Sequence, residues 1–168
     1  MLIRAATPYD ALSIVGIYNY YIENSIATFV ENAVSENYIT ENIAAAHSQN
    51  FPYLVAELGG EIVGYAYASR WKNRSAYRFS AETTVYLAQG STAKGIGSAL
   101  YEALFVELRL RSYHTVLAGI SLPNDASIAL HEKFGMEKVA HLSDVGYKFD
   151  KWVDVGYWQK NLINQSVK

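Results

Sequence analysis

Residues 90–98 read Gly-Ser-Thr-Ala-Lys-Gly-Ile-Gly-Ser and form the segment of this chain best suited to hold an anion. They follow a strand-like run and precede an amphipathic one, so the backbone N–H groups of residues 94–98 would be exposed at a helix N-terminus. Glycine at positions 95 and 97 would let a phosphate approach the main chain, and Lys94 adds a positive charge. The same residues also fit a surface turn with two glycines, and this segment alone leaves both interpretations open.

Two other phosphate-binding motifs do not fit this segment. A Walker loop ends in Gly-Lys followed by Ser or Thr, whereas Gly95 is followed by Ile96 and Gly97. A dinucleotide-binding turn has a third glycine at the position that Leu100 occupies. Both nucleotide-binding interpretations are therefore disfavoured.

Further along the chain, a polar stripe is predicted on one helix. Asn124, Ser127 and His131 stand at i, i+3 and i+7, so they share a helix face, and Leu130 and Phe134 can anchor that helix to a core. A polar stripe beside an apolar one suggests a face turned to a ligand. The alternative is a capping Asn124 followed by two surface residues.

A basic aromatic segment precedes a carboxylate on a predicted strand. Residues 70–78 hold three arginines and two aromatic residues, and Glu82 follows shortly after. A planar guanidinium suits bidentate binding of a carboxylate or phosphinate, so we predict that Arg78 binds the acid group of a small zwitterionic amino acid. The alternatives are a basic surface hairpin and a solvated glutamate at a strand end.

These segments lie in an alternation of strand-like and helix-like runs. Strands are predicted at residues 2–5, 53–58, 61–68, 81–87, 115–120, 139–140 and 148–158. Helices are predicted at residues 7–22, 35–47, 96–111 and 124–135. This order predicts an α/β (α+β) sandwich, with one mixed sheet and helices on both faces.

Composition limits the class of protein. The 168 residues are 51% apolar and 18% charged, which is typical of one globular domain, and we assign residues 1–160 to that domain and 161–168 to a polar tail. The net charge of -2 argues against nucleic-acid binding, and no apolar run is long enough to span a membrane. Cysteine is absent and the histidines lack metal-ligand spacing, so no metal site is predicted. No signal-peptide pattern is visible, and we expect a cytoplasmic protein.

Short motifs follow one another along nearly the whole chain, from Ile3-Arg4 to Trp158-Gln159. The most specific are Leu122-Pro123-Asn124-Asp125-Ala126-Ser127, Leu130-His131-Glu132, Gly146-Tyr147-Lys148 and residues 154–159, after Glu82-Thr83-Thr84-Val85-Tyr86 and Gly95-Ile96-Gly97. This ordered set resembles the Gcn5-related N-acetyltransferase (GNAT) superfamily and, within it, the phosphinothricin / methionine sulfone–sulfoximine acetyltransferase group. The resemblance implies a mostly antiparallel twisted sheet, acetyl-CoA as co-substrate, no metal, and a homodimer.

The resemblance also implies a reaction, the direct transfer of an acetyl group to the α-amine of a small amino acid or analogue. Phosphinothricin, methionine sulfoximine and methionine sulfone are the implied acceptors. An amino-acid ammonium must lose a proton before it can attack, and Glu82 is the predicted base. His131 stands where many relatives place a tyrosine that protonates the leaving thiolate, and a histidine could do so near neutral pH.

The remaining site residues are assigned by the same resemblance. The main chain of Val85, Tyr86 and Leu87 is expected to pair with the pantetheine arm, and the Leu87 amide to polarise the thioester carbonyl. Asn124 is expected to hold the pantetheine amide, with Ser127 beside it. The expected pyrophosphate loop comprises Ala93, Lys94, Gly95, Ile96, Gly97 and Ser98. The expected acceptor contacts are Ser75, Ala76 and Tyr77, to which we add Arg78.

Two departures from the family pattern keep alternatives open. Thr92 replaces the usual Gln or Arg at the start of the loop, which removes a donor to the pyrophosphate, and Ser80-Ala81 replace the usual Thr-Val before Glu82. The alternatives are the same fold acting on a polyamine, an aminoglycoside or a protein N-terminus, and a non-catalytic acyl-CoA-binding module.

Overall fold

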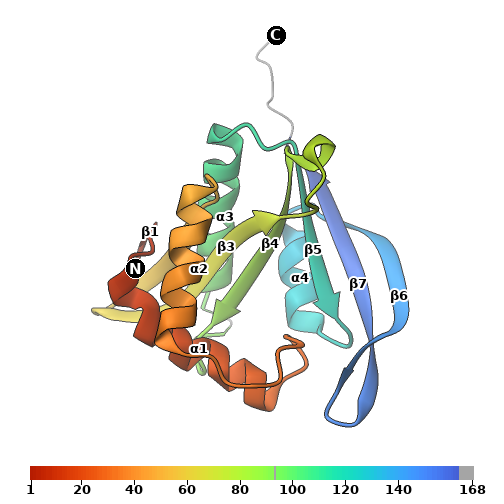
Figure 1. The fold of residues 1–168 in the computed structure, drawn as a ribbon, viewed down its shortest axis with the longest axis horizontal. Coiled ribbons are helices and arrows are strands. Elements are labelled where there is room, and N and C mark those ends of the chain that lie inside the picture. Colours follow the sequence, from red (N-terminus) through yellow and green to blue (C-terminus); the bar gives the residue numbers. More distant parts are fainter. Residues whose placement is uncertain (93, 163–168) are drawn as a thin grey trace.

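The protein is built around a seven-stranded sheet with the strand order β1-β2-β3-β4-β5-β7-β6, seen in a computed structural model that describes residues 1–92 and 94–162 (Figure 1). The strands are β1 (Leu2–Ala5), β2 (Tyr53–Leu58), β3 (Glu61–Arg70), β4 (Ser80–Leu87), β5 (Thr115–Ser121), β6 (Glu137–Lys148) and β7 (Lys151–Asn161). The pairing of β4 with β5 is parallel and the other pairings are antiparallel. The predicted mixed, mostly antiparallel sheet is thus confirmed.

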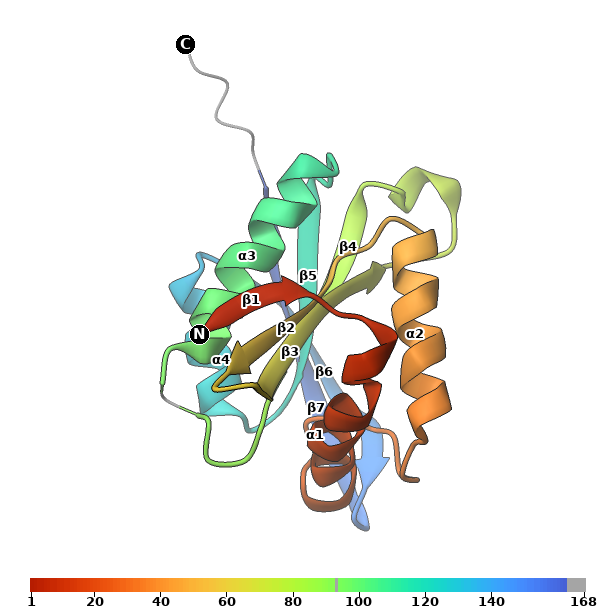
Figure 2. The same cartoon turned by 90° about the vertical axis from the view of Figure 1, so that its left-hand side faces the viewer.

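Helices cover both faces of this sheet, as Figure 2 shows. The helices are α1 (Ala11–Asn24), α2 (Glu36–Ser48), α3 (Ile96–Leu110) and α4 (Asp125–Lys133). On one face α1 and α2 bury Ile14 and Ile39 against tyrosines of β2 and β3. On the other face α3 buries Leu100 and Leu104 in a second core. The sheet therefore lies between two apolar layers. Within the described ranges no helix is long and apolar enough to cross a membrane.

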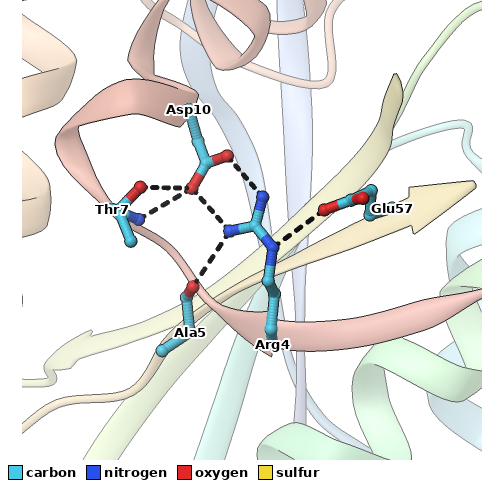
Figure 3. Close-up of polar contacts among 5 residues, drawn as sticks. All are labelled: Arg4, Ala5, Thr7, Asp10 and Glu57. Atoms are coloured by element: carbon cyan, nitrogen blue, oxygen red, sulfur yellow. Dashed lines mark hydrogen bonds and ion pairs between the residues drawn. The ribbon is translucent and has the colours of Figure 1, made fainter. Parts of the chain in front are cut away.

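The link from β1 to α1 is fixed by a partly buried ion pair (Figure 3). Both oxygens of the Asp10 carboxylate accept hydrogen bonds from the Arg4 guanidinium, at 2.7 and 2.8 Å. Asp10 also accepts from the backbone N–H and the hydroxyl of Thr7, at 2.8 and 3.0 Å, and Arg4 donates to Glu57 of β2. The Thr-Pro-x-Asp sequence, predicted as a helix start, therefore also ties the first helical turn to two strands.

The C-terminal hairpin differs from its prediction. The sequence predicts strands at 139–140 and 148–158, but β6 and β7 are both long and turn at Phe149 and Asp150. These two residues have φ angles of 53° and 57°, a conformation usually taken by Asn or Gly, so the turn carries no typical sequence signal. Two residues of the predicted tail 161–168 belong to the fold, because Asn161 ends β7 and Leu162 is buried, and residues 163–168 lie outside the described ranges.

Candidate active site

A cleft opens where β4 and β5 separate. The two strands pair only from Ser80 to Glu82 and from Thr115 to Leu117, and below this point they diverge (Figure 1). The cleft has a volume of about 210 Å³. Residues of β4, β5, α3, α4 and the loop before α3 line it, among them Thr83, Val85, Tyr86, Leu87, Thr92, Tyr101, Gly119, Ser121, Asn124, Ser127 and His131. The structure therefore brings together the β4 residues and the α4 stripe that the sequence singled out.

The N-terminus of α3 lies beside this cleft, since Gly97 packs near Leu87 and Leu130, but residues 94–98 are not among the residues that line it. The first-turn N–H groups of a helix have no helical partners. Gly95 caps the helix with φ 78°, a left-handed conformation that favours glycine. Gly97 packs closely against α4, because a Cβ there would lie 3.2 Å from a side-chain carbon of Leu130, and its predicted role toward a phosphate stays a prediction. Lys133 donates to the Ser98 hydroxyl at 2.8 Å and brings to this helix end a positive charge that the sequence analysis missed. The predicted contact Ala93 lies outside the described residues, and Lys94 is exposed.

His131 is buried and both of its ring nitrogens are engaged by the protein. Nδ1 lies 2.6 Å from the Ser127 carbonyl oxygen, so Nδ1 carries a proton and donates it. Nε2 lies 2.6 Å from the hydroxyl of Tyr101, which must donate to it when the ring is neutral. Burial holds the pKa of His131 below its usual 6.5, which favours the neutral ring.

Tyr101 was not predicted as a site residue. It lies on α3 beside the core residues Leu100 and Leu104, and it is fully buried. The available signal was its hydroxyl, since a buried tyrosine hydroxyl needs a polar partner. Asn124 lines the cleft and also caps α4 by accepting from the Ser127 N–H at 3.1 Å, and its contact with the pantetheine amide stays a prediction.

Ser121 is the second cleft residue that the sequence analysis missed. Its side chain is 7% exposed, and its Oγ has no hydrogen-bond partner in the part of the chain that the structure describes. A buried hydroxyl without a partner is costly in a folded protein and calls for an explanation. Because Ser121 lines the cleft, a ligand bound there would supply the missing partner.

Glu82 lies at the apex of the cleft and is the last residue of β4 that pairs with β5. It is not among the described lining residues, but its Oε1 lies 3.5 Å from where a Cβ on Gly119 would stand, and Gly119 does line the cleft. Burial raises the pKa of Glu82 above 4.5, and the positive charge of Lys72 partly opposes that rise. Tyr157 packs edge-on against Trp71 beside this carboxylate, with ring centres 5.3 Å apart.

The loop between α1 and α2 lies over the cleft and is held by three anchors. The Tyr86 hydroxyl donates to the Ala27 carbonyl at 3.2 Å. The buried Lys148 ammonium, on β6, donates to the carbonyl oxygens of Ser25 and Thr28, each at 2.8 Å. Phe29 fills the space that a side chain on Gly146 would need. The C-terminal hairpin therefore fixes the position of a loop near the start of the chain.

The predicted acceptor contacts lie away from this cleft. Ser75, Ala76 and Tyr77 form a short exposed 3-10 helix. The Arg78 guanidinium stacks on the Phe79 ring, 4.5 Å from its centre, and donates to the Ser75 carbonyl. Ser75 and Arg78 line a separate hollow at the far ends of β3 and β4. The cation whose charge reaches Glu82 is instead Lys72 of the same segment.

Comparisons with known proteins bear on this arrangement. A family model described as an acetyltransferase (GNAT) domain matches residues 3–156. A phosphinothricin N-acetyltransferase of Streptomyces viridochromogenes is 38% identical over 161 residues, which cover 95% of this chain and 87% of the relative. An L-methionine sulfoximine/L-methionine sulfone acetyltransferase of Salmonella typhimurium is 32% identical over 162 residues, which cover 96% and 95%.

A solved structure shows the same architecture. A GNAT superfamily phosphinothricin acetyltransferase from Sinorhizobium meliloti, crystallised in complex with AcCoA, superposes with a TM-score of 0.94. It is 33% identical in sequence, and the superposition covers 99% of this chain and 91% of that one.

Proposed function

The chain belongs to the GNAT acetyltransferase family, and on that premise we propose that it transfers an acetyl group from acetyl-CoA to the α-amine of a small amino acid or amino-acid analogue. The family predicted from the sequence motifs is confirmed, and with it the class of enzyme, an acetyl-CoA-dependent N-acetyltransferase. The names of relatives at 32% and 38% identity support phosphinothricin, methionine sulfoximine or methionine sulfone as acceptors. The observation that carries the proposal is the cleft between the diverging strands β4 and β5, with Glu82 at its apex.

The residues around the cleft fit acetyl-CoA. Below Glu82 one edge of β4 has no strand partner, so we expect the pantetheine arm to pair along the main chain from Val85 to Leu87. The Leu87 carbonyl already accepts from the Tyr21 hydroxyl at 2.9 Å, so the Leu87 N–H is the group left for the thioester. The Ser121 hydroxyl, which lacks a partner in the described chain, would gain one. The N-terminus of α3 together with Lys133 offers N–H groups and positive charge to the pyrophosphate, in keeping with the predicted role of residues 93–98.

Glu82 acts in this proposal as the general base. The raised pKa of its half-buried carboxyl makes it a better proton acceptor than a solvated glutamate. It takes a proton from the acceptor ammonium, directly or through a water, and the nitrogen lone pair then attacks the thioester carbon. The carbon–sulfur bond then breaks, the nitrogen loses its second proton to solvent, and the acetyl group stays on the acceptor as an amide.

We further propose that His131 supplies the proton for the leaving sulfur through Tyr101. Neither ring nitrogen is free to donate directly, but the Tyr101 hydroxyl also lines the cleft. When His131 is protonated, Tyr101 can pass its own proton to the sulfur and take the Nε2 proton in the same step. A neutral Tyr101–His131 pair remains afterwards, and solvent restores the proton to His131.

Assembly and location extend the proposal. The β6–β7 hairpin carries exposed apolar side chains, among them Tyr147 at 50%, Phe149 at 50% and Trp152 at 64% exposure. Such a patch is typical of a protein interface, and it supports the homodimer that the family resemblance implies. We propose that this hairpin forms the dimer contact and that the enzyme works in the cytoplasm.

The test is a CoA-release assay with amino acids, amino-acid analogues, polyamines and aminoglycosides as acceptors. Turnover is expected with the amino-acid group, and Glu82→Gln should lower kcat by about 100-fold or more while leaving binding of acetyl-CoA intact. Full turnover by Glu82→Gln would remove the proposed base. Binding of CoA in calorimetry with no release across the panel would favour the non-catalytic module instead.

A further inference from the structure

A second cavity, of about 300 Å³, lies between α2 and strands β2 and β3 on the face of the sheet that α1 and α2 cover. We call it the tyrosine groove, because its walls include Tyr18, Tyr38, Tyr53, Tyr65 and Tyr67. The rings of the last three are nearly parallel, with interplanar angles of 6° to 11° and centres 4.9 to 6.2 Å apart. Its volume is at the lower end of the range for small-molecule sites, which start at about 300 Å³.

The groove opens on the same face as the proposed base. Tyr67 pairs with Thr84 and Ser69 pairs with Glu82 across β3 and β4, and directly opposed residues of an antiparallel pair point to the same side. Tyr67 and Ser69 line the groove, so its wall lies one strand spacing, about 4.8 Å, from Glu82. The negative charge of Glu82 is among the causes that, after burial, raise the pKa of Tyr67 to about 12.

Two tyrosine hydroxyls in the groove have no hydrogen-bond partner among the described residues. Tyr53 and Tyr65 are 3% and 2% exposed, and in the described part of the chain neither hydroxyl makes a hydrogen bond. Burial raises the pKa of both, so both stay neutral and able to donate or accept. Tyrosine hydroxyls that face a groove beside flat rings provide the mix of apolar wall and placed polar groups that marks a ligand pocket.

Charge narrows the ligand that fits. Among the described residues that line the groove Arg70 is the single charged one, and no carboxylate is present to neutralise a cation. A positively charged side chain would therefore lose hydration without gaining a counter-ion, whereas an uncharged polar tip could bond to the tyrosine hydroxyls. An anionic tip could reach Arg70 at the rim.

We propose that the tyrosine groove receives the side chain of the acceptor amino acid and selects uncharged or anionic side chains over cationic ones. This inference rests on the proposed function, since it assumes that Glu82 receives the α-ammonium of the same acceptor. With the amine at Glu82 and the side chain in the groove, the neighbouring strand β3 sets the specificity of the enzyme.

The first test fills the groove from its solvent side. Ala45 and Ala44 are adjacent exposed residues on α2, but Ala45 lines the groove and Ala44 does not. With the best amino-acid acceptor of the panel, Ala45→Phe should raise the acceptor KM by about tenfold or more and leave the acetyl-CoA KM within about twofold. Ala44→Phe, the matched control, should behave like the wild type. An unchanged acceptor KM in Ala45→Phe would overturn the inference.

The second test adds the missing carboxylate. L-Citrulline and L-arginine have nearly the same shape and differ in charge, so the wild type should favour citrulline in kcat/KM. Asn42→Asp places a negative charge in the groove wall and should shift that ratio toward arginine by about tenfold, whereas Asn37→Asp, on another face of α2, should not. A ratio that Asn42→Asp leaves unchanged would refute the charge argument. If none of the amino acids tested leads the wild type to release CoA, the proposed function itself is refuted. This outcome is distinct from either variant result.

Discussion

Replacing Tyr101 with phenylalanine removes one hydroxyl and tests the buried pair at the centre of the cleft. The hydroxyl lies 2.6 Å from His131 Nε2, and the two side chains are 0% and 3% exposed. Its other contact, with Thr83 at 3.4 Å, is too long to contribute much. Tyr101→Phe therefore leaves a buried acceptor nitrogen without a partner, which costs about 2 kcal/mol of the free energy of unfolding.

Denaturant unfolding followed by tryptophan fluorescence measures this cost. For a chain of this length 2 kcal/mol corresponds to a fall in Tm of about 4–8 °C. The double variant Tyr101→Phe/His131→Leu replaces both partners with apolar groups, so it should be less destabilised than the sum of the single variants by at least about 1 kcal/mol. Strict additivity would show that the two side chains are not coupled.

Kinetics tests the proposed relay with the same variant. The relay needs protonated His131, whose pKa burial lowers below 6.5, so its contribution is present at acidic pH and is lost as pH rises through that pKa. The ratio of wild-type to Tyr101→Phe kcat should be about tenfold or more near pH 6. It should approach one near pH 9, where a thiolate leaves without help. A ratio that stays constant across this range would refute the relay and leave the pair a structural role only.

Three further predictions follow from single contacts. Lys72→Met removes a positive charge that lowers the pKa of Glu82, so the acidic limb of the kcat/KM profile should move to higher pH. A limb that does not move would show that Lys72 does not act on the base. Asp10→Asn should lower the free energy of unfolding by about 2 kcal/mol at pH 7. Because the ion pair lowers the folded-state pKa of Asp10, the difference from wild type in urea unfolding should shrink as pH falls below about 4. A difference that does not depend on pH would contradict this linkage. Gly97→Ala places a methyl group 3.2 Å from Leu130 and should lower Tm by a few degrees, about 1 kcal/mol, and a neutral result would mean that α4 shifts freely.

The sequence is informative where local chemistry decides the structure. Periodicity and turn residues predict the order of strands and helices, because each amphipathic segment buries one face and Gly-Gly at 59–60 favours the hairpin between β2 and β3. The turn at Phe149 and Asp150 was missed because its positive φ angles are imposed by the long β6–β7 ladder and not by residue type.

The site was predictable where a motif carries it and unpredictable where tertiary contacts do. The β4 residues and the α4 stripe meet in the cleft as expected, since the strand and helix periods fix which side chains share a face. Tyr101 was missed because a tyrosine on an apolar helix face is typical of a core residue. The direction of the loop after β3 is set by its packing, so the sequence does not reveal that Arg78 stacks on Phe79 and lies away from the cleft.

Lys148 has a consequence for the order in which this protein is made. A ribosome releases the chain from its N-terminus, so the loop at Ser25–Thr28 emerges more than a hundred residues before the ammonium that holds it. The antiparallel partner of β5 is β7, which also comes last. A chain that ends before β6 lacks the Lys148 contacts to this loop and the β7 partner of β5. We therefore expect such a chain to have an incomplete cleft and no acetyltransferase activity.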